Sequence, residues 1–557
     1  MNGKIIINGI LISILLFLSV LSFSQSHFPG NFAVYFTDKN NSNYSLDKPQ
    51  EFLSLKSISR REKQNITIDS SDLPVSQSYI TNLTAFGKIK YTSRWQNSAL
   101  VIFNDSASFV NAKKLPFVIH IDYLGQVAKK KKKKSYKQNS KIESNYEPTY
   151  DSFPDYGATR NQLDLLGLTP MHHAGYIGDG VLMAILDAGF YNANKADAFN
   201  AVRDRNGIII ARDFVVPDNN VYKENSHGTY VMSTIAGEVK GKYFGAAPGV
   251  DFMLLRTEDV HSEFPVEEYY WLVGAEFADS AGADIITSSL SYTTFDDTLL
   301  NHNWDMMDGK STIVSRAASK AFDKGILVTT SAGNDGANSW RKIGFPGDAI
   351  NVLTIGAVDS LGNYAALSSV GYSADGRIKP DLMAVGKATA LVSGNDIVFY
   401  GNGTSFSTPT MAGAVATLIQ SNPKSSAVEI RNAILHSAHQ FYNPDSIMGY
   451  GIPDFFVANL ILKDMPADSI TKELFFQIVP NPFDNGFYLV LAPADTQVID
   501  ISIFDISGKN IWQTKFNTSP GTSALYISGL RDKANGLYFI KLITGDKAYT
   551  RKIIKQR

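Results

Sequence analysis

The chain has 557 residues, and its 52 Lys and Arg residues nearly balance its 53 Asp and Glu residues, which gives a net charge of −1. This balance provides no electrostatic basis for a nucleic-acid partner, because phosphate binding requires a concentrated basic surface. The absence of cysteine excludes disulfides, thiolate metal sites and cysteine nucleophiles. The length allows about three or four folding units.

The N-terminus combines one early lysine, Lys4, with an apolar core at Ile10–Phe23 and the small-residue end Ser22–Gln25. This order is typical of a signal peptide, which we expect over residues 1–25. An uncleaved membrane anchor is the alternative, because Ile5–Phe23 approaches the length of a spanning helix. The small residues at the end of the apolar core favour cleavage.

Residues 26–125 alternate short β-like runs with polar connections. Residues 126–155 then contain six consecutive lysines, Lys129–Lys134, followed by a polar stretch. Like charges crowded in this way repel one another and resist burial, so this segment is predicted to be a linker. It is either a protease-sensitive joint after a removable pro-region, or a solvated spacer or anionic-surface contact. The β-like runs are Phe32–Phe36, Ala99–Phe103 and Phe117–Tyr123.

Residues 156–465 show a different pattern, in which continuous apolar runs alternate with Ala-rich amphipathic stretches such as Val231–Ala236 and Met411–Gln420. Apolar strands that alternate with helices indicate a parallel sheet covered on both faces. We therefore expect one α/β domain of roughly 300 residues. Its expected strands are Val181–Leu186, Phe252–Leu255, Ile285–Ile286, Ile326–Val328 and Val352–Val358.

The C-terminal segment, residues 474–557, changes pattern once more. Ile499, Ile501 and Ile503 alternate with polar residues, and turn-forming residues such as Asn535-Gly536 interrupt the runs. Alternation with a period of two predicts a small antiparallel β-sandwich. The segment contains no helix pattern and no catalytic cluster.

Four short motifs in the α/β domain carry candidate chemistry. Asp187 ends an apolar strand, at the sheet edge where α/β proteins bind ligands. His227 opens a helical stretch, and Asn334 follows another strand within a Gly-rich turn. Each of these three has an ordinary structural explanation when taken alone. The specific signal is the fourth motif, Gly403–Pro409, which places Ser405 near the start of a helix at Thr410–Gln420.

A histidine pair, His172 and His173, lies in an amphipathic stretch before a Gly-rich turn. Adjacent residues on a helix point in different directions. We therefore expect both to be surface residues rather than metal ligands.

The motifs Asp187–Gly189, His227–Thr229, Ser331–Gly336 and Gly403–Pro409, in this order, resemble those of the subtilisin family of serine peptidases. The resemblance covers residues 156–465. It implies an α/β, subtilisin-like three-layer fold with a mainly parallel central sheet. A small α+β pro-region would precede this domain, and a small all-β sandwich would follow it.

The resemblance also implies roles for individual residues. Ser405 would be the nucleophile, His227 the general base and acid, and Asp187 the residue that orients the imidazole. The Asn334 amide would bind the oxyanion together with the Ser405 backbone N–H.

Substrate binding is implied for five further residues. The family usually has Gly where Ser291 stands, so close substrate approach is less certain there. The Phe345–Pro346 bond is expected to be cis. No cofactor is required for the chemistry, and structural calcium is expected at sites that the sequence does not locate. The substrate-binding residues are Ser289, Leu290, Ser291, Ala332 and Gly333.

Both flanks resemble known modules. Residues 26–125 are expected to act as the chain's own inhibitor and folding chaperone. The motifs Val479–Phe483, Asp505–Lys509 and Asn535–Tyr538 resemble the C-terminal sorting domain of Bacteroidetes type IX secretion. The expected partners are therefore protein or peptide substrates and the outer-membrane secretion machinery, with no nucleic acid. The protein would be secreted or held at the cell surface.

The leading hypothesis is a secreted serine endopeptidase made as a zymogen and active at neutral to alkaline pH. An alternative is an inactive cell-surface binding protein on a subtilase scaffold. A third possibility is an acid-acting serine-carboxyl peptidase, which uses a carboxylate base and an Asp at the oxyanion position. The presence of His227 and Asn334 argues against the third.

Overall fold

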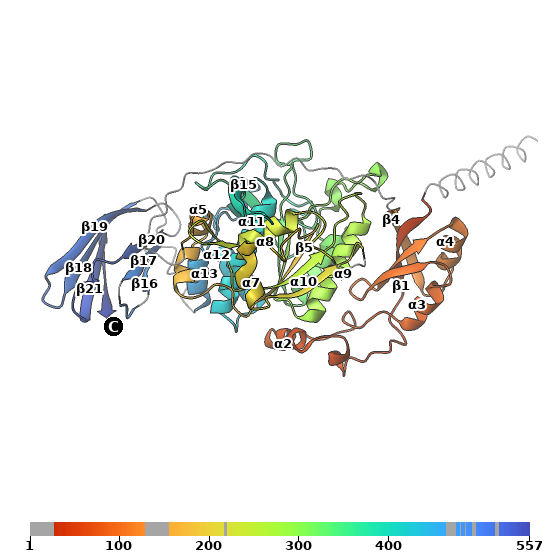
Figure 1. Ribbon diagram of the computed structural model, residues 1–557, viewed down its shortest axis with the longest axis horizontal. Coiled ribbons are helices and arrows are strands. Elements are labelled where there is room, and N and C mark those ends of the chain that lie inside the picture. The colour runs from red at the N-terminus through yellow and green to blue at the C-terminus, as the bar shows by residue number, and fades with distance from the viewer. Residues whose placement is uncertain are drawn as a thin grey trace, which may run out of the picture.

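The computed structural model describes residues 27–127, 155–216, 220–463, 475–479, 481–484, 486–492, 497–518 and 523–556. Figure 1 shows an N-terminal unit (residues 27–127) beside a central α/β domain, with the C-terminal strands at the opposite end. The predicted signal segment 1–25 and the run Lys129–Lys134 lie outside the described residues. Among those described, no helix combines the length and apolarity needed to cross a bilayer.

The N-terminal unit is a four-stranded antiparallel sheet in the order β2-β3-β1-β4, with helices packed around it. Every residue of β1 is buried, in keeping with the apolar run Phe32–Phe36. The three predicted β-like runs fall in β1, β3 and β4. The elements are β1 (Gly30–Phe36), α2 (Leu55–Lys63), α3 (Gln77–Leu83), β2 (Lys88–Ser93), β3 (Ser98–Phe103), α4 (Ser106–Lys113) and β4 (Val118–Gln126).

The central domain is built on seven parallel strands in the order β13-β12-β11-β10-β5-β9-β6. All five predicted apolar runs fall in this sheet. The sequence analysis did not predict the two other strands, the half-exposed edge strand β6 and the four-residue, fully buried β13, although both contain short apolar runs. The strands are β5 (Leu182–Asp187), β6 (Ile208–Asp213), β9 (Asp251–Arg256), β10 (Ile285–Ser288), β11 (Leu327–Ser331), β12 (Leu353–Val358) and β13 (Leu382–Val385).

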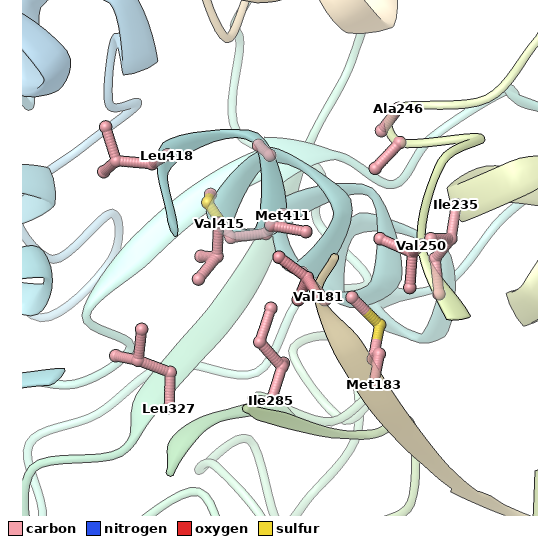
Figure 2. Close-up of a cluster of buried hydrophobic side chains, with 14 of the residues drawn as sticks. Val181, Met183, Ile235, Ala246, Val250, Ile285, Leu327, Met411, Val415 and Leu418 are labelled. Carbon is pink, nitrogen blue, oxygen red and sulfur yellow. The ribbon is translucent and has the colours of Figure 1, made fainter. Parts of the chain in front are cut away.

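Side chains of β5 alternate between two hydrophobic clusters, one on each face of the sheet. Met183 and Ile185 join the cluster formed with α8 and α11, whereas Leu182 and Leu186 join the cluster formed with α9 and α10. Figure 2 shows Met411 and other α11 side chains packed over the first face. The predicted three-layer α/β fold is confirmed. The covering helices are α8 (His227–Ala236), α9 (Val266–Ala281), α10 (Ile313–Asp323) and α11 (Thr404–Ser421).

Smaller elements complete the domain and support the loops around the sheet. Two short two-stranded sheets pair β7 with β8 and β14 with β15. The elements are α5 (Arg160–Asp164), α6 (Leu168–His173), α7 (Asn200–Asp204), β7 (Glu238–Val239), β8 (Tyr243–Phe244), β14 (Thr389–Val392), β15 (Val398–Gly401), α12 (Ala427–His436) and α13 (Phe455–Leu462).

The prediction of a surface histidine pair is wrong for His172, which is only 6% exposed. Its Nδ1 lies 3.1 Å from the hydroxyl of Tyr156, and its Nε2 lies 2.8 Å from the carbonyl oxygen of Ala246. Burial lowers the pKa of His172 to about 4, so the ring is neutral. The two hydrogen bonds allow α6 to bury this ring, while His173 is exposed as predicted.

The C-terminal strands form two antiparallel sheets, β16-β17-β20 and β19-β18-β21-β22, that share one apolar core. Ile499, Ile501 and Ile503 are fully buried, as their alternation predicts. Among the described residues after 474 there is no helix, and the all-β prediction is confirmed. The strands are β16 (Phe475–Val479), β17 (Phe487–Ala492), β18 (Gln497–Asp505), β19 (Asn510–Thr518), β20 (Ser523–Ile527), β21 (Gly536–Thr544) and β22 (Lys547–Lys555).

The N-terminal unit is bound to α9 through a buried ion cluster centred on Asp279. The carboxylate of Asp279 lies 2.5 Å from Arg60, 2.9 Å from Arg61 and 2.6 Å from Arg94. Burial alone would raise the pKa of Asp279, but the three guanidinium groups hold it below its ordinary value. The aspartate is therefore ionised and compensated entirely by charges from the N-terminal unit.

A second carboxylate of α9, Glu276, receives the turn that joins β2 to β3. It accepts hydrogen bonds from the hydroxyl of Ser93 at 2.5 Å, from the backbone N–H of Arg94 at 3.0 Å and from that of Trp95 at 3.1 Å. All of these groups come from residues far from α9 in the sequence. The interface is thus polar at its centre, and the carboxylate of Glu276 has three donors from the N-terminal unit.

Candidate active site

The sheet and two helix N-termini bring the predicted acid, base and nucleophile to one edge of the central domain. Asp187 is the last residue of β5, His227 is the first of α8, and Ser405 is the second of α11. Nδ1 of His227 lies 2.9 Å from Oδ1 and 3.0 Å from Oδ2 of Asp187. Because a carboxylate only accepts hydrogen bonds, this contact places the imidazole proton on Nδ1 and leaves Nε2 as the basic nitrogen.

The environments of Asp187 and His227 differ in a way that suits proton transfer. The Asp187 side chain is fully buried, whereas that of His227 is 29% exposed. Burial lowers the pKa of His227, but the charge of Asp187 and its hydrogen bond outweigh burial and raise the pKa above its ordinary value. The imidazole can therefore hold a proton more readily than a free histidine.

The helix that carries Ser405 starts earlier than the sequence predicts, and it therefore contains Pro409 in its interior. The helix begins at Thr404 rather than Thr410, so Pro409 lies inside it rather than in its first turn. Proline has no N–H, which leaves the carbonyl of Ser405 without its usual helical donor. The hydroxyl of Ser289 donates to this carbonyl at 2.9 Å instead, and the hydroxyl of Ser405 lies 3.4 Å from the carbonyl oxygen of Ser289.

Asn334 is held beside the N-terminus of the same helix. Its side-chain oxygen accepts hydrogen bonds from the backbone N–H of Thr404 at 2.9 Å and from its hydroxyl at 3.1 Å. With the oxygen engaged in this way, the NH₂ group is the end of the amide that can donate to another molecule. Gly403 precedes the helix at φ +152°, a conformation that favours glycine. Thr404 is a positioning residue that the sequence analysis missed.

Two segments that follow adjacent strands border the space next to Ser405. Ser289, Leu290 and Ser291 follow β10, and Ala332 and Gly333 follow β11. The hydroxyl of Ser331 donates to the carbonyl of Leu290 at 3.0 Å and joins the two segments. Ser289 and Leu290 are buried, whereas Ser291 is exposed. The Phe345–Pro346 bond is cis, as predicted.

One group of carboxylates among the described residues is close enough to hold a metal ion: Glu258, Glu263 and Glu267. Burial raises the pKa of Glu263 to about 7, and neighbouring carboxylates add to the effect. Both oxygens of Glu267 already accept backbone N–H groups, from Asp259 at 2.7 Å and from Phe264 at 3.3 Å. The two oxygens of Glu267 are therefore already engaged by backbone donors, and we assign no calcium to this cluster.

Comparisons with protein families agree with the three-part organisation. The Subtilase family matches residues 178–451, and the Peptidase S8 propeptide domain of Bacteroidota matches residues 31–141. The Secretion system C-terminal sorting domain matches residues 477–556. The predicted resemblances of the catalytic domain and of both flanks are confirmed. The sorting domain indicates a protein exported across the outer membrane.

Curated relatives include Subtilisin NAT of Bacillus subtilis subsp. natto, which is 29% identical over 273 residues, 48% of this chain and 63% of that protein. Subtilisin DY of Bacillus licheniformis is 30% identical over 47% of this chain and 85% of that protein. Alkaline elastase YaB of Bacillus sp. (strain YaB) is 31% identical over 48% of this chain and 62% of that protein.

The solved structure of MycP1 from Mycobacterium smegmatis has a TM-score of 0.43 and 21% identity, over 56% of this chain and 87% of that one. The family match and the identity to Subtilisin DY are the findings that decide the assignment. The chain belongs to the subtilase family.

Proposed function

We propose that this protein is a secreted serine endopeptidase, made as a zymogen, that hydrolyses peptide bonds through an acyl-enzyme. The observation that carries the proposal is the contact of both carboxylate oxygens of Asp187 with Nδ1 of His227, at the sheet edge where Ser405 lies in the first turn of α11. Each of these residues is of the type that acyl transfer requires.

The mechanism assigns one proton route to these residues. Oγ of Ser405 bonds to the carbonyl carbon of the substrate while Nε2 of His227 takes the hydroxyl proton. His227 then gives this proton to the leaving amine as the C–N bond breaks. Water attacks the acyl-enzyme by the same route and restores Ser405. Asp187 stabilises the imidazolium in both halves, and no metal or organic cofactor takes part.

The oxyanion of each tetrahedral intermediate would be bound by two donors. One is the NH₂ group of Asn334, whose orientation follows from the two hydrogen bonds of Thr404 to its oxygen. The other is the backbone N–H of Ser405 in the first turn of α11, where helical N–H groups have no intrahelical partner. The positive end of the helix dipole favours the same negative charge.

The substrate backbone would be bound as an added strand along the segment that follows β10. Among the described residues, the backbone N–H and carbonyl of Ser291 make no hydrogen bond. A peptide in extended conformation can pair with such an edge. Leu290, Ala332 and Gly333 border the space beside it, and Ser289 contacts the nucleophile.

The zymogen proposal assigns a role to every part of the chain. The N-terminal unit would inhibit the catalytic domain in the same chain, and the C-terminal domain would bind the outer-membrane secretion machinery. The propeptide and sorting-domain matches support these two roles. The proposed parts are a signal peptide (1–25), a pro-region (26–125), a joint (126–155), a catalytic domain (156–465) and a sorting domain (474–557).

The proposed activity is tested by casein hydrolysis with purified mature protein. We expect Ser405→Ala to lower turnover by about 10⁶, the size of effect known for the subtilisin nucleophile. Ser407→Ala is the matched control, because this serine lies in the same helix turn with its hydroxyl bonded to the carbonyl of Thr404. Full activity in Ser405→Ala would contradict the proposal, and an inactive wild-type protein would favour the binding-protein alternative.

The zymogen proposal is tested separately by the intact mass of the secreted protein. Removal of the pro-region predicts a mature N-terminus between about residues 126 and 155, the Lys-rich segment. A mature protein that begins near Ser26 would retain the pro-region and would contradict this part of the proposal.

A further inference from the structure

Three charged residues end adjacent strands of the central sheet and lie side by side. Asp187 ends β5, Arg256 ends β9 and Asp213 ends β6, and Arg256 is the register partner of both aspartates. Neighbouring strands lie about 4.8 Å apart, and paired residues of parallel strands have their side chains on the same face of the sheet. Arg256 and Asp213 have no part in the proposed proton route, yet each is only 3% exposed. A buried cation therefore lies one strand away from the proposed catalytic carboxylate.

The guanidinium of Arg256 binds the residue that follows Asp187. Its Nε donates to the carbonyl oxygen of Ala188 at 3.2 Å. The N–H of the same Ala188 donates to Oδ1 of Asp187 at 2.7 Å, and the N–H of Thr257 donates to the carbonyl oxygen of Asp187 at 3.0 Å. The position of Ala188, and with it one of the hydrogen bonds that orient the carboxylate, therefore depends on Arg256.

Asp213 provides the counter-charge of Arg256. Nη1 of Arg256 lies 2.8 Å from Oδ2 of Asp213. The other oxygen, Oδ1, accepts the backbone N–H groups of Val215 at 2.8 Å and Val216 at 2.9 Å, which fixes the carboxylate in place. Because opposite charges attract strongly inside a protein, an Arg256 without this partner would act on the next carboxylate in the row, that of Asp187.

We propose that Arg256 and Asp213 are positioning residues for Asp187. Arg256 holds the backbone that orients the carboxylate. Asp213 balances the charge of Arg256 and so leaves the charge of Asp187 to act on the imidazole. A buried ion pair returns little net stability, because the loss of hydration offsets the attraction, so stability alone does not account for this pair. The inference rests on the proposed function and adds two residues to the same site.

Three other ionisable groups lie near this row of strand ends. Glu258 interacts with Asp187, but burial raises the pKa of Glu258 well above its ordinary value and suppresses its charge. Lys90 donates to a backbone carbonyl of the loop after β6, and it belongs to the N-terminal unit. Arg212 stacks over aromatic rings on the other face of the sheet. A test in mature protein therefore removes Lys90 and leaves the ion pair of Asp213 as the element that is varied.

The test measures kcat and KM across pH with a chromogenic peptide and the full mature protein. In Asp213→Asn the amide oxygen can still accept the two backbone N–H groups, but Arg256 loses its counter-charge. The acid midpoint of kcat/KM is expected to fall by about half a pH unit, because the uncompensated cation disfavours protonated His227. In Arg256→Met the negative charge of Asp213 is uncompensated instead, and the midpoint is expected to rise by a similar amount.

The positioning role of Arg256 is measured separately by kcat. Arg256→Met should lower kcat by about 10²-fold with little change in KM, because Ala188 loses its donor and the catalytic pair is displaced. The double variant Arg256→Met/Asp213→Asn should restore the wild-type midpoint while kcat stays low. Arg256→Lys keeps the charge without the planar fork, so we expect the wild-type midpoint and a partial recovery of kcat. It serves if Arg256→Met is unstable.

Arg205→Met is the matched control. This arginine pairs with Asp251 at the opposite end of β9, so its loss should leave both the midpoint and kcat as in wild type. Shifts of the same sign in Asp213→Asn and Arg256→Met, or no shift in either, would overturn the inference while leaving the proposed function intact. A wild-type protein that neither cleaves the peptide nor reacts with phenylmethylsulfonyl fluoride at Ser405 would overturn both.

Discussion

Two buried aspartates of the central domain, Asp279 and Asp187, are compensated in opposite ways. Asp279 is surrounded by Arg60, Arg61 and Arg94, all from the N-terminal unit. Asp187 contacts a single histidine of its own domain. The proposed catalytic pair is therefore complete within the central domain, whereas the charge of Asp279 is balanced by groups of the N-terminal unit.

The ion cluster around Asp279 is therefore expected to matter for stability, and the contact between Asp187 and His227 for the reaction. Removal of one partner from a buried ion cluster leaves an uncompensated charge, which is strongly destabilising. Release of the N-terminal unit must therefore be accompanied by hydration of Asp279 at the newly exposed surface of α9. The contact between Asp187 and His227 needs no such change, so the proposed catalytic geometry does not depend on the N-terminal unit.

The largest expected effect is that of Asp187→Asn, which removes the negative charge from the contact with His227. The amide can donate to Nδ1 of His227, which stabilises the wrong tautomer while preserving the shape of the site. We expect kcat to fall by about 10⁴, measured with a chromogenic peptide. Thermal stability should change little. A loss of less than ten-fold would show that Asp187 does not orient His227.

Asp279→Ala removes the carboxylate at the centre of the buried ion cluster, and it should affect stability rather than the reaction. In an inactive Ser405→Ala zymogen, the free energy of unfolding in urea is expected to fall by about 3–5 kcal/mol, because three guanidinium groups lose their buried partner. The control is Glu51→Ala, which removes an exposed ion pair with Lys48. It should cost less than about 1 kcal/mol. Equal effects of the two substitutions would contradict the role of the cluster.

A smaller catalytic effect is expected from Asn334→Ala. Loss of one oxyanion donor should lower kcat by about 10²–10³, the size measured for this change in subtilisin itself, with little change in KM. Steady-state kinetics on one peptide separates the two parameters. An increase in KM at constant kcat would assign Asn334 to ground-state binding instead.

The smallest effect is a displacement of the pH profile. The charge of Asp187 raises the pKa of His227, so the acid limb of kcat/KM should have its midpoint above the ordinary histidine value of 6.5. Activity falls below this midpoint because protonated His227 cannot accept the Ser405 proton. In Asp187→Asn the midpoint should move to lower pH. A midpoint below 6.5 in wild type would contradict the effect of Asp187.

Local patterns account for most of what the sequence predicts correctly. The five apolar runs are strands because each is buried on both faces, and Asp187 is placed correctly because it ends one of these strands. The sequence analysis placed the start of α11 too late, because it took Pro409 to mark the first turn of the helix. Pro409 fits inside the helix because Ser289 donates to the carbonyl that proline leaves without a donor, and this contact cannot be seen in the sequence. Burial of His172 likewise depends on partners that are distant in sequence, among them Ala246.

The ion cluster around Asp279 also depends on contacts between residues distant in sequence, so the sequence alone does not predict it. Arg60 and Asp279 are 219 residues apart, and neither belongs to a recognisable motif. Charged residues in amphipathic helices are normally solvated, so their sequence pattern gives no sign of burial. Tertiary contact alone distinguishes these arginines from surface residues.

The central claim, that Ser405 is the nucleophile of a serine peptidase, is tested most directly by covalent labelling. Mature protein is treated with phenylmethylsulfonyl fluoride, and the modified residue is located by peptide mapping. We predict complete loss of casein hydrolysis and a single label on Ser405, which Asp187→Asn should slow because His227 then lacks its orienting carboxylate. Inactivation with a label on any other residue, or no label on active protein, would contradict the assignment.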